Sequence, residues 1–166
     1  MKPGQKQQDS SSETISINTP IGALIISAED GAVCSIALAE PGSEPIAKEN
    51  ADDPVLRQAA RELKEYFAGE RSEFTFPMRA GGTMFQQRVW VALREIPFGE
   101  TKSYGQIAAE IDNPNASRAV GMACNKNPIM IAVPCHRVVG VSGALVGYAY
   151  GTGTKQFLLY LEQKNK

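Results

Sequence analysis

The order of apolar and polar residues along the chain predicts short strands first and helices afterwards. Apolar and β-branched residues gather in three short runs, Ser12 to Ile17, Gly22 to Ser27 and Ala32 to Leu38. Runs of this length and composition, bounded by turn residues, are typical of strands. Asn18-Thr19-Pro20 separates the first two runs, so we expect the three strands to form an antiparallel meander.

A helical spacing of apolar residues follows. Pro54 to Phe67 places its apolar side chains three or four positions apart, which predicts a helix that Gly69 ends. Phe74 to Met78 alternates and predicts a further short strand, and Arg79 to Gly82 has the glycines of a linker. We therefore predict a domain boundary near residue 80, with a flexible tail at 1–13, an N-terminal α/β domain at 14–79 and a second domain at 80–166.

Helices dominate beyond the linker. Thr83 can cap a helix whose apolar face, from Phe85 to Ile96, ends before Pro97-Phe98-Gly99. A second helix is expected from Ser103 to Ile111 and a third from Ala116 to Lys126. Two short helices joined by a tight turn predict a helix-turn-helix, although many such helical hairpins do not bind DNA.

The end of the chain combines an apolar run with one more helix. Ile129 to Val133 is interpreted as a strand-like segment that leads into Pro134-Cys135-His136, and a final helix is expected from Lys155 to about Glu162. The chain as a whole is expected to be an α+β protein. Its small N-terminal α/β domain precedes a mainly helical second domain.

Composition narrows the class of protein. The chain is 43% hydrophobic and 21% charged, close to an average globular protein. No apolar run is long enough to span a bilayer, so no membrane association is expected. Cys34, Cys124 and Cys135 are odd in number and scattered, which is typical of reduced thiols and predicts a cytoplasmic protein. With a single histidine we expect no zinc site and no other metal.

The charges are divided unevenly. The net charge of −1 argues against binding to nucleic acid. Residues 1–78, however, hold 7 Lys/Arg against 13 Asp/Glu, and residues 79–166 hold 10 against 5, so the two parts carry −6 and +5. Such asymmetry favours a basic face for nucleic acid on the second part, although uneven surface charge is also common without a partner.

Cys135 is the main candidate for chemistry. It follows an apolar run and has His136 and Arg137 beside it, and positive charge near a thiol favours the nucleophilic thiolate. A free cysteine in an apolar run can equally be a small buried hydrophobic residue. Successive residues of a strand point to opposite faces, so a bend or a bridging water would have to connect Cys135 with His136. A cysteine hydrolase brings its histidine from a distant segment, and this chain has no second histidine.

The residues around Cys135 resemble a known signature. Residues 83 to 163 are similar to the O6-alkylguanine-DNA alkyltransferases, while the N-terminal half matches loosely. The resemblance rests on Pro134-Cys135-His136-Arg137-Val138, Asn127-Pro128 and Gly147-Tyr148, and upstream on Phe85-Gln86, Val89-Trp90, Ile96-Pro97, Gly99-Glu100-Thr101, Ser103-Tyr104 and Arg118-Ala119-Val120-Gly121. It implies a ribonuclease H-like N-terminal domain and a winged helix-turn-helix-like catalytic domain.

The resemblance implies an activity and its machinery. The protein would repair double-stranded DNA by moving the alkyl group of O6-alkylguanine irreversibly to Cys135, once per molecule and without a cofactor. O4-methylthymine is a second candidate substrate, and the family suggests a monomer. His136 would take the thiol proton through a water, and Glu162 would orient that histidine. Asn127 would brace the turn that holds the cysteine.

The family also implies how the base and the DNA are held. The hydroxyl of Tyr104 would face N3 of the guanine. The base pocket would be formed by the main chain of Cys135 and Val138, the N–H of Ala149, the ring of Tyr148, and Tyr150. Tyr150 stands where several members carry a glycine, so it would narrow the entrance for large adducts unless its ring turns outward.

A base inside duplex DNA cannot reach Cys135, so the nucleotide must be flipped out of the helix. Arg118 matches the family's arginine finger, which would fill the gap. The helix-turn-helix would dock in the minor groove, where small residues permit close approach to the backbone. These residues are Ala116, Ala119, Gly121 and Ala123.

Without the resemblance, several of these residues have plainer interpretations. Glu162 would be a solvated helix residue, Tyr104 a core tyrosine and Arg118 a surface arginine. Two other classes of protein also remain open, a winged-helix regulator with a structural or redox-sensing cysteine and a cysteine hydrolase. Family members that bind zinc use histidines that this chain lacks, and a non-catalytic group replaces the cysteine that this chain retains.

Overall fold

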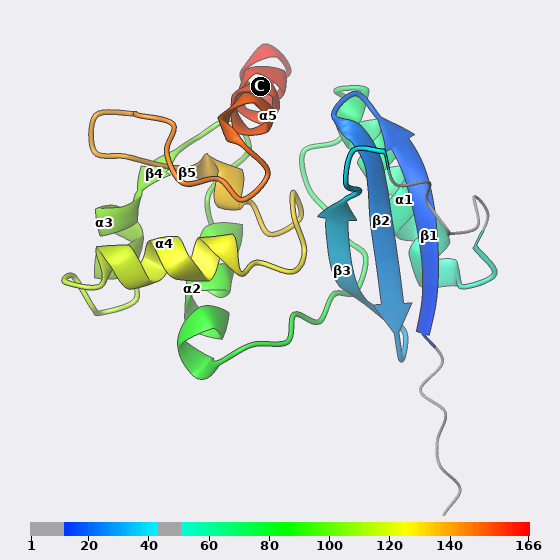
Figure 1. The fold of residues 1–166 in the computed structure, drawn as a ribbon, viewed down its shortest axis with the longest axis horizontal. Helices are drawn as coiled ribbons and strands as arrows, with labels where there is room; N and C mark the ends of the chain where they lie inside the picture. The colour runs from blue at the N-terminus through cyan, green and yellow to red at the C-terminus, as the bar shows by residue number, and fades with distance from the viewer. Residues whose placement is uncertain (1–11, 43–50) are drawn as a thin grey trace, which may run out of the picture.

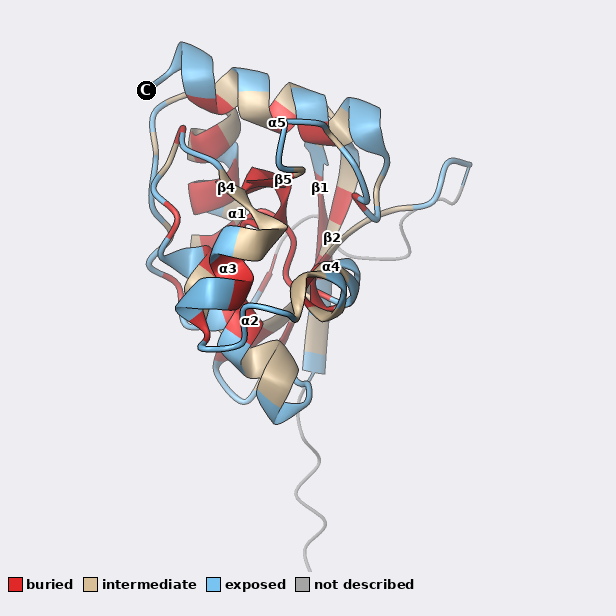
Figure 2. Cartoon of the chain, turned by 90° about the vertical axis from the view of Figure 1, so that its left-hand side faces the viewer, coloured by how far each residue is buried: buried red, intermediate tan, exposed pale blue. Residues whose placement is uncertain are grey.

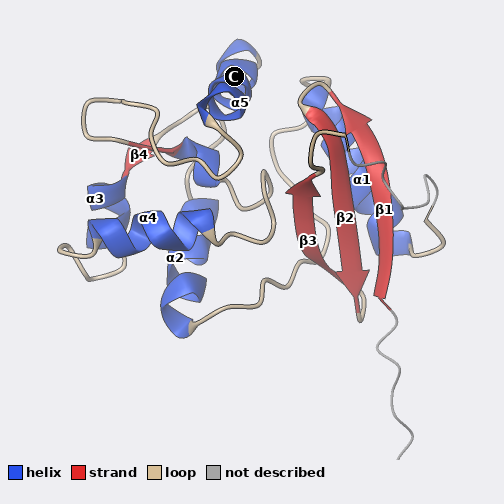
Figure 3. Cartoon of the chain, in the orientation of Figure 1, coloured by secondary structure: helices blue, strands red, loops and turns tan. Residues whose placement is uncertain are grey.

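The computed structural model describes residues 12–42 and 51–166 and divides them into two parts that pack side by side. Figure 1 and Figure 3 show the strands β1 to β3 and helix α1 on one side and the remaining helices on the other. The α+β class and the order of its two parts are therefore confirmed.

The first part is built on an antiparallel sheet. The strands β1 (Ser12–Thr19), β2 (Gly22–Glu29) and β3 (Ala32–Leu38) pair in the order β1-β2-β3, so the predicted meander is confirmed. The tail predicted at 1–13 is too long, because β1 begins at Ser12 and the Glu13 carboxylate accepts hydrogen bonds from the backbone N–H groups of Asp52 and Asp53. Residues 1–11 of that prediction lie outside the described residues.

Helix α1 (Pro54–Phe67) has the predicted bounds and covers one face of the sheet. The Asp53 side chain caps it by accepting from the Val55 N–H, and a proline in the first turn suits the free N–H groups there. The buried face of α1 consists of Leu56, Ala59, Glu62, Leu63 and Tyr66.

The strand predicted from Phe74 to Met78 is wrong. Only Met78 makes an isolated bridge, with Val33 of β3. The N–H groups of Thr75 and Phe76 donate to the buried carboxylate of Glu62 instead of to a neighbouring strand, and Pro77 has no N–H to offer. The Glu62 side chain of α1 therefore supplies the hydrogen-bond partners that a neighbouring strand would otherwise supply.

Four helices form most of the second part. They are α2 (Met84–Arg94), α3 (Tyr104–Glu110), α4 (Ser117–Asn125) and α5 (Thr152–Lys164). Thr83 and Ser103 begin α2 and α3 with complete capping boxes. Helix α2 ends before Ile96, which is nevertheless buried, and α5 begins three residues before the predicted Lys155. The helix pair α3 and α4 has the predicted position.

The apolar run Ile129 to Val133 is strand-like only at Ile129, which makes an isolated parallel bridge with Ile36 of β3, and this corrects the prediction. It forms a buried turn in which the Ala132 N–H donates to the Met130 carbonyl around Ile131, whose φ is +71°. This left-handed conformation is strained for a β-branched residue. The turn leads into the 3₁₀ helix η1 (Cys135–Arg137) and β5 (Val138–Val139), which pairs in parallel with β4 (Lys102–Ser103).

The core runs through both parts. Figure 2 shows buried segments facing the interior from the sheet, from α2 to α5 and from the segment around η1. Within the described residues, no helix is long and apolar enough to cross a membrane, and no cluster of three or more His, Cys, Asp or Glu could hold a metal ion.

Candidate active site

Cys135 opens the 3₁₀ helix η1 and is only 5% exposed. The side-chain amide of Asn127, just after α4, donates to its sulfur over 3.3 Å and to the carbonyl of Val133 over 2.8 Å. Asn127 also accepts from the N–H of Ile129. One buried amide thus joins both ends of the turn to the thiol, which fits the bracing role expected for Asn127.

His136 follows Cys135 in η1 and is fully buried. Its Nε2 lies 2.9 Å from Oε1 of Glu162 on α5, while its buried Nδ1 has no hydrogen-bond partner among the described residues. The 3₁₀ geometry of η1 removes the difficulty that a strand would have created, because its successive side chains are not on opposite faces. Glu162 is fully buried and is not the solvated residue that sequence position alone suggests.

Arg137 corrects one expectation. Its guanidinium donates to both oxygens of Glu162 and to the carbonyl of Ile96, and it stacks near the ring of Phe98. The positive charge of Arg137 is therefore compensated by a buried carboxylate rather than directed at the Cys135 sulfur.

These contacts decide the resting charges. Burial raises the pKa of the Cys135 thiol, against the opposing effects of the Asn127 amide and the Lys155 charge. Burial lowers the pKa of His136, although Glu162 opposes it. Burial alone would raise the pKa of Glu162, but hydrogen bonds and charge from His136 and Arg137 outweigh it and bring that pKa to about 2. The resting pair is thus a neutral thiol beside a neutral imidazole.

Lys155 is a buried residue that the sequence analysis did not assign to the site. Its ammonium donates to the carbonyl oxygens of Val138 and Val146 and lies 5.9 Å from the centre of the Tyr104 ring. It is also the cation whose charge acts on Cys135. The spacing Lys155, Leu158, Glu162 on one helix face was the available signal, because it places both charged residues beside a buried leucine.

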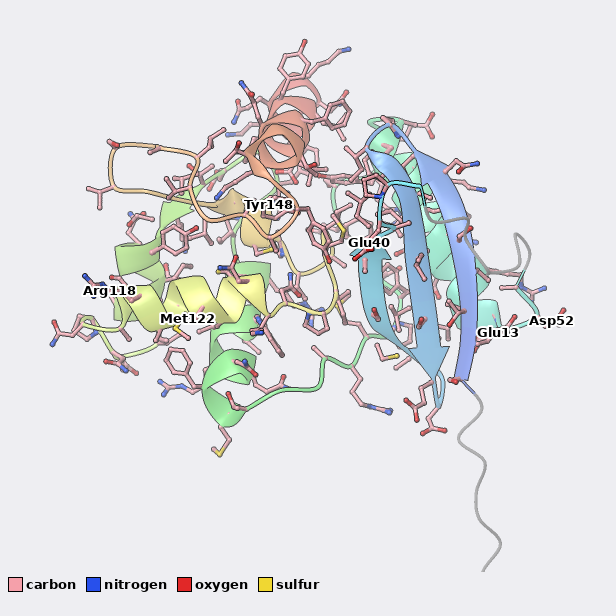
Figure 4. All side chains as sticks on the ribbon, in the orientation of Figure 1. Glu13, Glu40, Asp52, Arg118, Met122 and Tyr148 are labelled. Carbon is pink, nitrogen blue, oxygen red and sulfur yellow. The ribbon has the colours of Figure 1, made fainter. Side chains whose placement is uncertain are left out.

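Of the residues predicted to form the base pocket, Tyr148 and Tyr150 lie near enough to Cys135 for it to raise the pKa of their hydroxyls. Val138 is buried, and its carbonyl already accepts from Lys155. Tyr148 is 9% exposed, its buried hydroxyl has no partner among the described residues, and Figure 4 shows it on the loop that leads into α5. Its ring meets that of Tyr150 edge to face at 5.7 Å. Ala149 between them is exposed.

Tyr150 faces inward rather than outward. Its ring is partly buried and packs against the core, and burial together with the nearby Cys135 raises the pKa of its hydroxyl. The sequence left two orientations open for this ring, and the structure has the inward one, in which the ring lies near Cys135.

A groove of about 400 Å³ opens between α3, α4 and the loop after β5. Tyr104 lines it and donates its hydroxyl to the carbonyl of Val146 over 2.9 Å, and burial with the nearby cysteines raises the pKa of that hydroxyl to about 12. Arg118, exposed near the start of α4, and Gly121 line it too. The helix-turn-helix and the loop thus surround one surface.

The small residues of α4 divide between two faces. Ala119 and Gly121 are partly exposed on the outer side, with Ala116 just before the helix. Ala123 is buried, and its carbonyl accepts from the Trp90 indole, so its predicted place against DNA is wrong. Met122, one turn after Arg118 on α4, is 69% exposed and was not among the residues predicted to meet DNA. Figure 4 labels both side chains.

Comparison with known families matches both parts of the chain. The family described as "6-O-methylguanine DNA methyltransferase, DNA binding domain" matches residues 84–164. The ribonuclease-like domain of 6-O-methylguanine DNA methyltransferases matches residues 14–80.

Individual relatives extend over most of the chain. A methylated-DNA–protein-cysteine methyltransferase of Methanosarcina acetivorans is 56% identical over 111 residues, which cover 67% of this chain and 71% of the relative. The constitutive methylated-DNA–protein-cysteine methyltransferase of Bacillus subtilis is 45% identical and covers 87% and 92%. The OGT of Mycobacterium tuberculosis, whose crystal structure is in complex with DNA, is 44% identical with a TM-score of 0.83 and covers 92% and 94%.

Proposed function

The chain belongs to the 6-O-methylguanine DNA methyltransferase family, and from that premise we propose that Cys135 is the thiol that receives the alkyl group. The protein is a methylated-DNA–protein-cysteine methyltransferase, which repairs DNA by alkyl transfer to a cysteine. The observation that supports Cys135 is its position between the Asn127 amide and the His136–Glu162 pair. The Cys34 thiol instead donates to the backbone carbonyl of Ser27, and burial raises the pKa of the Cys124 thiol to about 12.

The proposed reaction uses neutral partners at rest. A water between Cys135 and Nδ1 of His136 carries the thiol proton to the imidazole, and Glu162 stabilises the imidazolium that forms. The sulfur then attacks the alkyl carbon, so that an S–C bond forms while the bond from that carbon to O6 breaks. Tyr104 donates a proton to N3 of the leaving guanine and regains one from the imidazolium through solvent. The products are a thioether and an intact guanine.

The thioether explains a single turnover. The Cys135 thiolate is too poor a leaving group for water to displace from a thioether at neutral pH, and the chain has no second histidine to assist. Each molecule therefore acts once and is consumed. This distinguishes the reaction from that of a cysteine hydrolase, whose thioester is hydrolysed.

We infer that the DNA lies across the groove between α4 and the loop after β5. The target nucleotide is flipped out toward Cys135, and Arg118 fills its place in the duplex. Ala116, Ala119 and Gly121 let α4 approach the minor groove closely. The flipped base is held by Val138, Tyr148, Ala149 and Tyr150. O4-methylthymine is a second candidate substrate for the same pocket.

The remaining features of the proposal concern the whole molecule. We propose a monomer that works in the cytoplasm with its thiols reduced, as its three free cysteines suggest. We also propose that the boundary between its two domains lies near residue 80.

An intact-mass measurement tests the proposed function. The protein is incubated with excess duplex oligonucleotide that contains one O6-methylguanine, and both partners are weighed over time. We expect one methyl group per chain, an equal amount of repaired guanine and no further turnover. Continued turnover would indicate a hydrolase, and DNA binding without any mass change would indicate a regulator.

A further inference from the structure

One contact at the candidate site comes from the other part of the molecule. The hydroxyl of Tyr66, on α1 of the N-terminal part, donates to Oε1 of Glu162 over 3.0 Å. The same oxygen faces Nε2 of His136 at 2.9 Å. A phenol from residues 12–80 thus shares one carboxylate oxygen with the histidine of the second part.

The ring of Tyr66 is held firmly. The side chain is fully buried, and its ring packs against Phe67 and Phe74 of its own part at 5.3 and 5.5 Å and against Phe98 of the second part at 6.2 Å. Because aromatic neighbours surround the ring, its hydroxyl has little freedom to choose another acceptor. The hydrogen bond to Glu162 is therefore a fixed feature of the interface.

Several charged and titratable groups surround the same carboxylate. Arg137 of η1 donates to both oxygens, and the Gly99 N–H lies 3.4 Å from Oε2. Two further groups act on the partners of this carboxylate, because the Lys155 charge lowers the pKa of His136 and Tyr148 raises that of Tyr66. Among these groups, Tyr66 is the neutral donor on the oxygen that His136 uses.

We propose that Tyr66 is a positioning residue for alkyl transfer: its hydroxyl fixes Oε1 of Glu162 against His136 and takes up part of the carboxylate's negative charge. This inference rests on the proposed function of Cys135 and His136. It gives the N-terminal domain a part in the chemistry, because α1 sets how strongly His136 binds a proton.

The direction of the effect follows from electrostatics. A hydrogen bond donated to a carboxylate disperses its charge, so removal of the Tyr66 hydroxyl leaves more negative charge facing His136. The protonated imidazole is then better stabilised and the pKa of His136 rises. Only the neutral form of His136 can accept the thiol proton. When its pKa is higher, the neutral form is lost at a higher pH, so the transfer rate begins to fall at a higher pH.

The test uses Tyr66→Phe, which removes the hydroxyl and keeps the ring. Tyr160→Phe is the matched control, because Tyr160 lies on α5 two residues from Glu162 but is 65% exposed. His136 is the single histidine of the chain, so its imidazole nitrogens can be titrated by NMR without ambiguity and without substrate. The rate of methyl transfer from O6-methylguanine in a duplex is measured over the same pH range.

We expect Tyr66→Phe to raise the titration midpoint of His136 by about half a pH unit or more, and to shift the acid limb of the transfer rate equally. Tyr160→Phe should leave both midpoints unchanged. An unchanged midpoint in Tyr66→Phe, with only a lower melting temperature, would reduce Tyr66 to a packing residue and overturn the inference. Absence of methyl on wild-type Cys135 would instead overturn the proposed function, so the two failures are distinguishable.

Discussion

The two parts of the molecule differ in the polar side chains that they bury. Among the described residues, the sheet and α1 bury the polar side chains of Ser16 and Glu62, while the second part buries Asn127, His136, Arg137, Lys155 and Glu162. Burying charged groups costs stability unless each is paired, and an apolar core is often as stable. The second part therefore carries a polar core that packing alone does not require, and chemistry at Cys135 gives it a reason.

The two buried carboxylates make the contrast concrete. Glu62 accepts from the hydroxyl and N–H of Thr75 and from the N–H of Phe76, so it holds a loop in place. Glu162 accepts from His136 and Arg137, groups that themselves carry or exchange protons. Glu62 therefore stabilises the fold, whereas Glu162 influences where the proton on His136 is held. Tyr66 connects the two parts at the second of them.

The largest expected effect is on methyl transfer, and it distinguishes Cys135 of the second part from Cys34 of the first. Cys135→Ser should lower methyl transfer by more than about a thousandfold, because a hydroxyl is a far weaker nucleophile at neutral pH. Binding to alkylated duplex should persist, since phosphate and groove contacts lie elsewhere. Cys34→Ser, in β3, should leave transfer unchanged. Gel-shift and mass assays measure both quantities, and wild-type transfer by Cys135→Ser would refute the assignment.

The next largest effect distinguishes the two buried carboxylates, Glu162 and Glu62. Glu162→Gln should slow transfer by about a hundredfold, because the imidazolium formed on His136 loses its counter-charge. It should also destabilise the fold by about 3–5 kcal/mol, since Arg137 remains buried without its partner. Glu62→Gln should lower only stability. Denaturant unfolding and single-turnover rates below the melting transition measure both effects, and an equal rate loss in the two variants would remove the contrast.

The acid stability of the protein has the same origin. The pKa of Glu162 is lowered from 4.5 to about 2 in the folded chain. A lowered carboxyl pKa contributes stability that is complete above pH 4.5 and is lost as pH falls toward about 2. Between these values Glu162→Gln should therefore lose less stability than the wild type, as urea midpoints at several pH values would reveal. Parallel losses in the two proteins would contradict the ion-pair account.

Arg118→Ala tests which part meets the DNA. It should slow repair of duplex DNA by about ten- to a hundredfold but leave reaction with free O6-methylguanine nearly unchanged, because only the duplex contains a gap to fill. Arg57→Ala, an exposed arginine on α1, is the matched control and should affect neither substrate. Equal losses on both substrates would argue against an intercalating arginine.

Tyr150→Gly tests the rim of the pocket. The inward ring should hinder a benzyl adduct, so wild-type protein should react with O6-benzylguanine much more slowly than with O6-methylguanine in DNA. The glycine variant should recover about tenfold in the benzyl reaction, since the obstacle is steric. Rates of Cys135 alkylation on both substrates separate this from a folding defect. Rapid benzyl transfer in the wild type, unchanged in the variant, would show that Tyr150 does not control access.

The smallest expected effect concerns two exposed methionines, Met122 and Met84. Met122 lies on the outer face of α4 beside Arg118, where a flexible apolar side chain can wedge against the minor groove. Met122→Ala should slow duplex repair by about three- to fivefold and leave the free base unaffected. Met84, at the start of α2, is even more exposed, and Met84→Ala should change neither rate. Equal behaviour of the two variants on duplex would contradict a contact at Met122.

Local signals predicted most of the fold. Caps at Thr83 and Ser103, helical spacing from Pro54 and the three strand runs each depend on neighbours within a few residues. The strands expected at Phe74 to Met78 and Ile129 to Val133 failed because their backbone partners are set by Glu62 and by a tight turn at Ile131. Periodicity alone cannot reveal such partners.

The site shows the same limit. The resemblance selected Cys135, His136, Asn127 and Glu162, and the structure brings these four together. It did not reveal that Arg137 pairs with Glu162, and it did not select Lys155 or Tyr66. Tyr66 is 96 residues away from Glu162 along the chain, so no local pattern connects the two residues.

A peptide map of the reacted protein tests the central claim most directly. After reaction with a duplex that carries isotopically labelled O6-methylguanine, the protein is digested, and the peptides that contain Cys34, Cys124 and Cys135 are weighed separately. The account predicts one labelled methyl group, on Cys135 alone, in amounts equal to the guanine repaired. Label on Cys34 or Cys124, or repair without label on any cysteine, would contradict it.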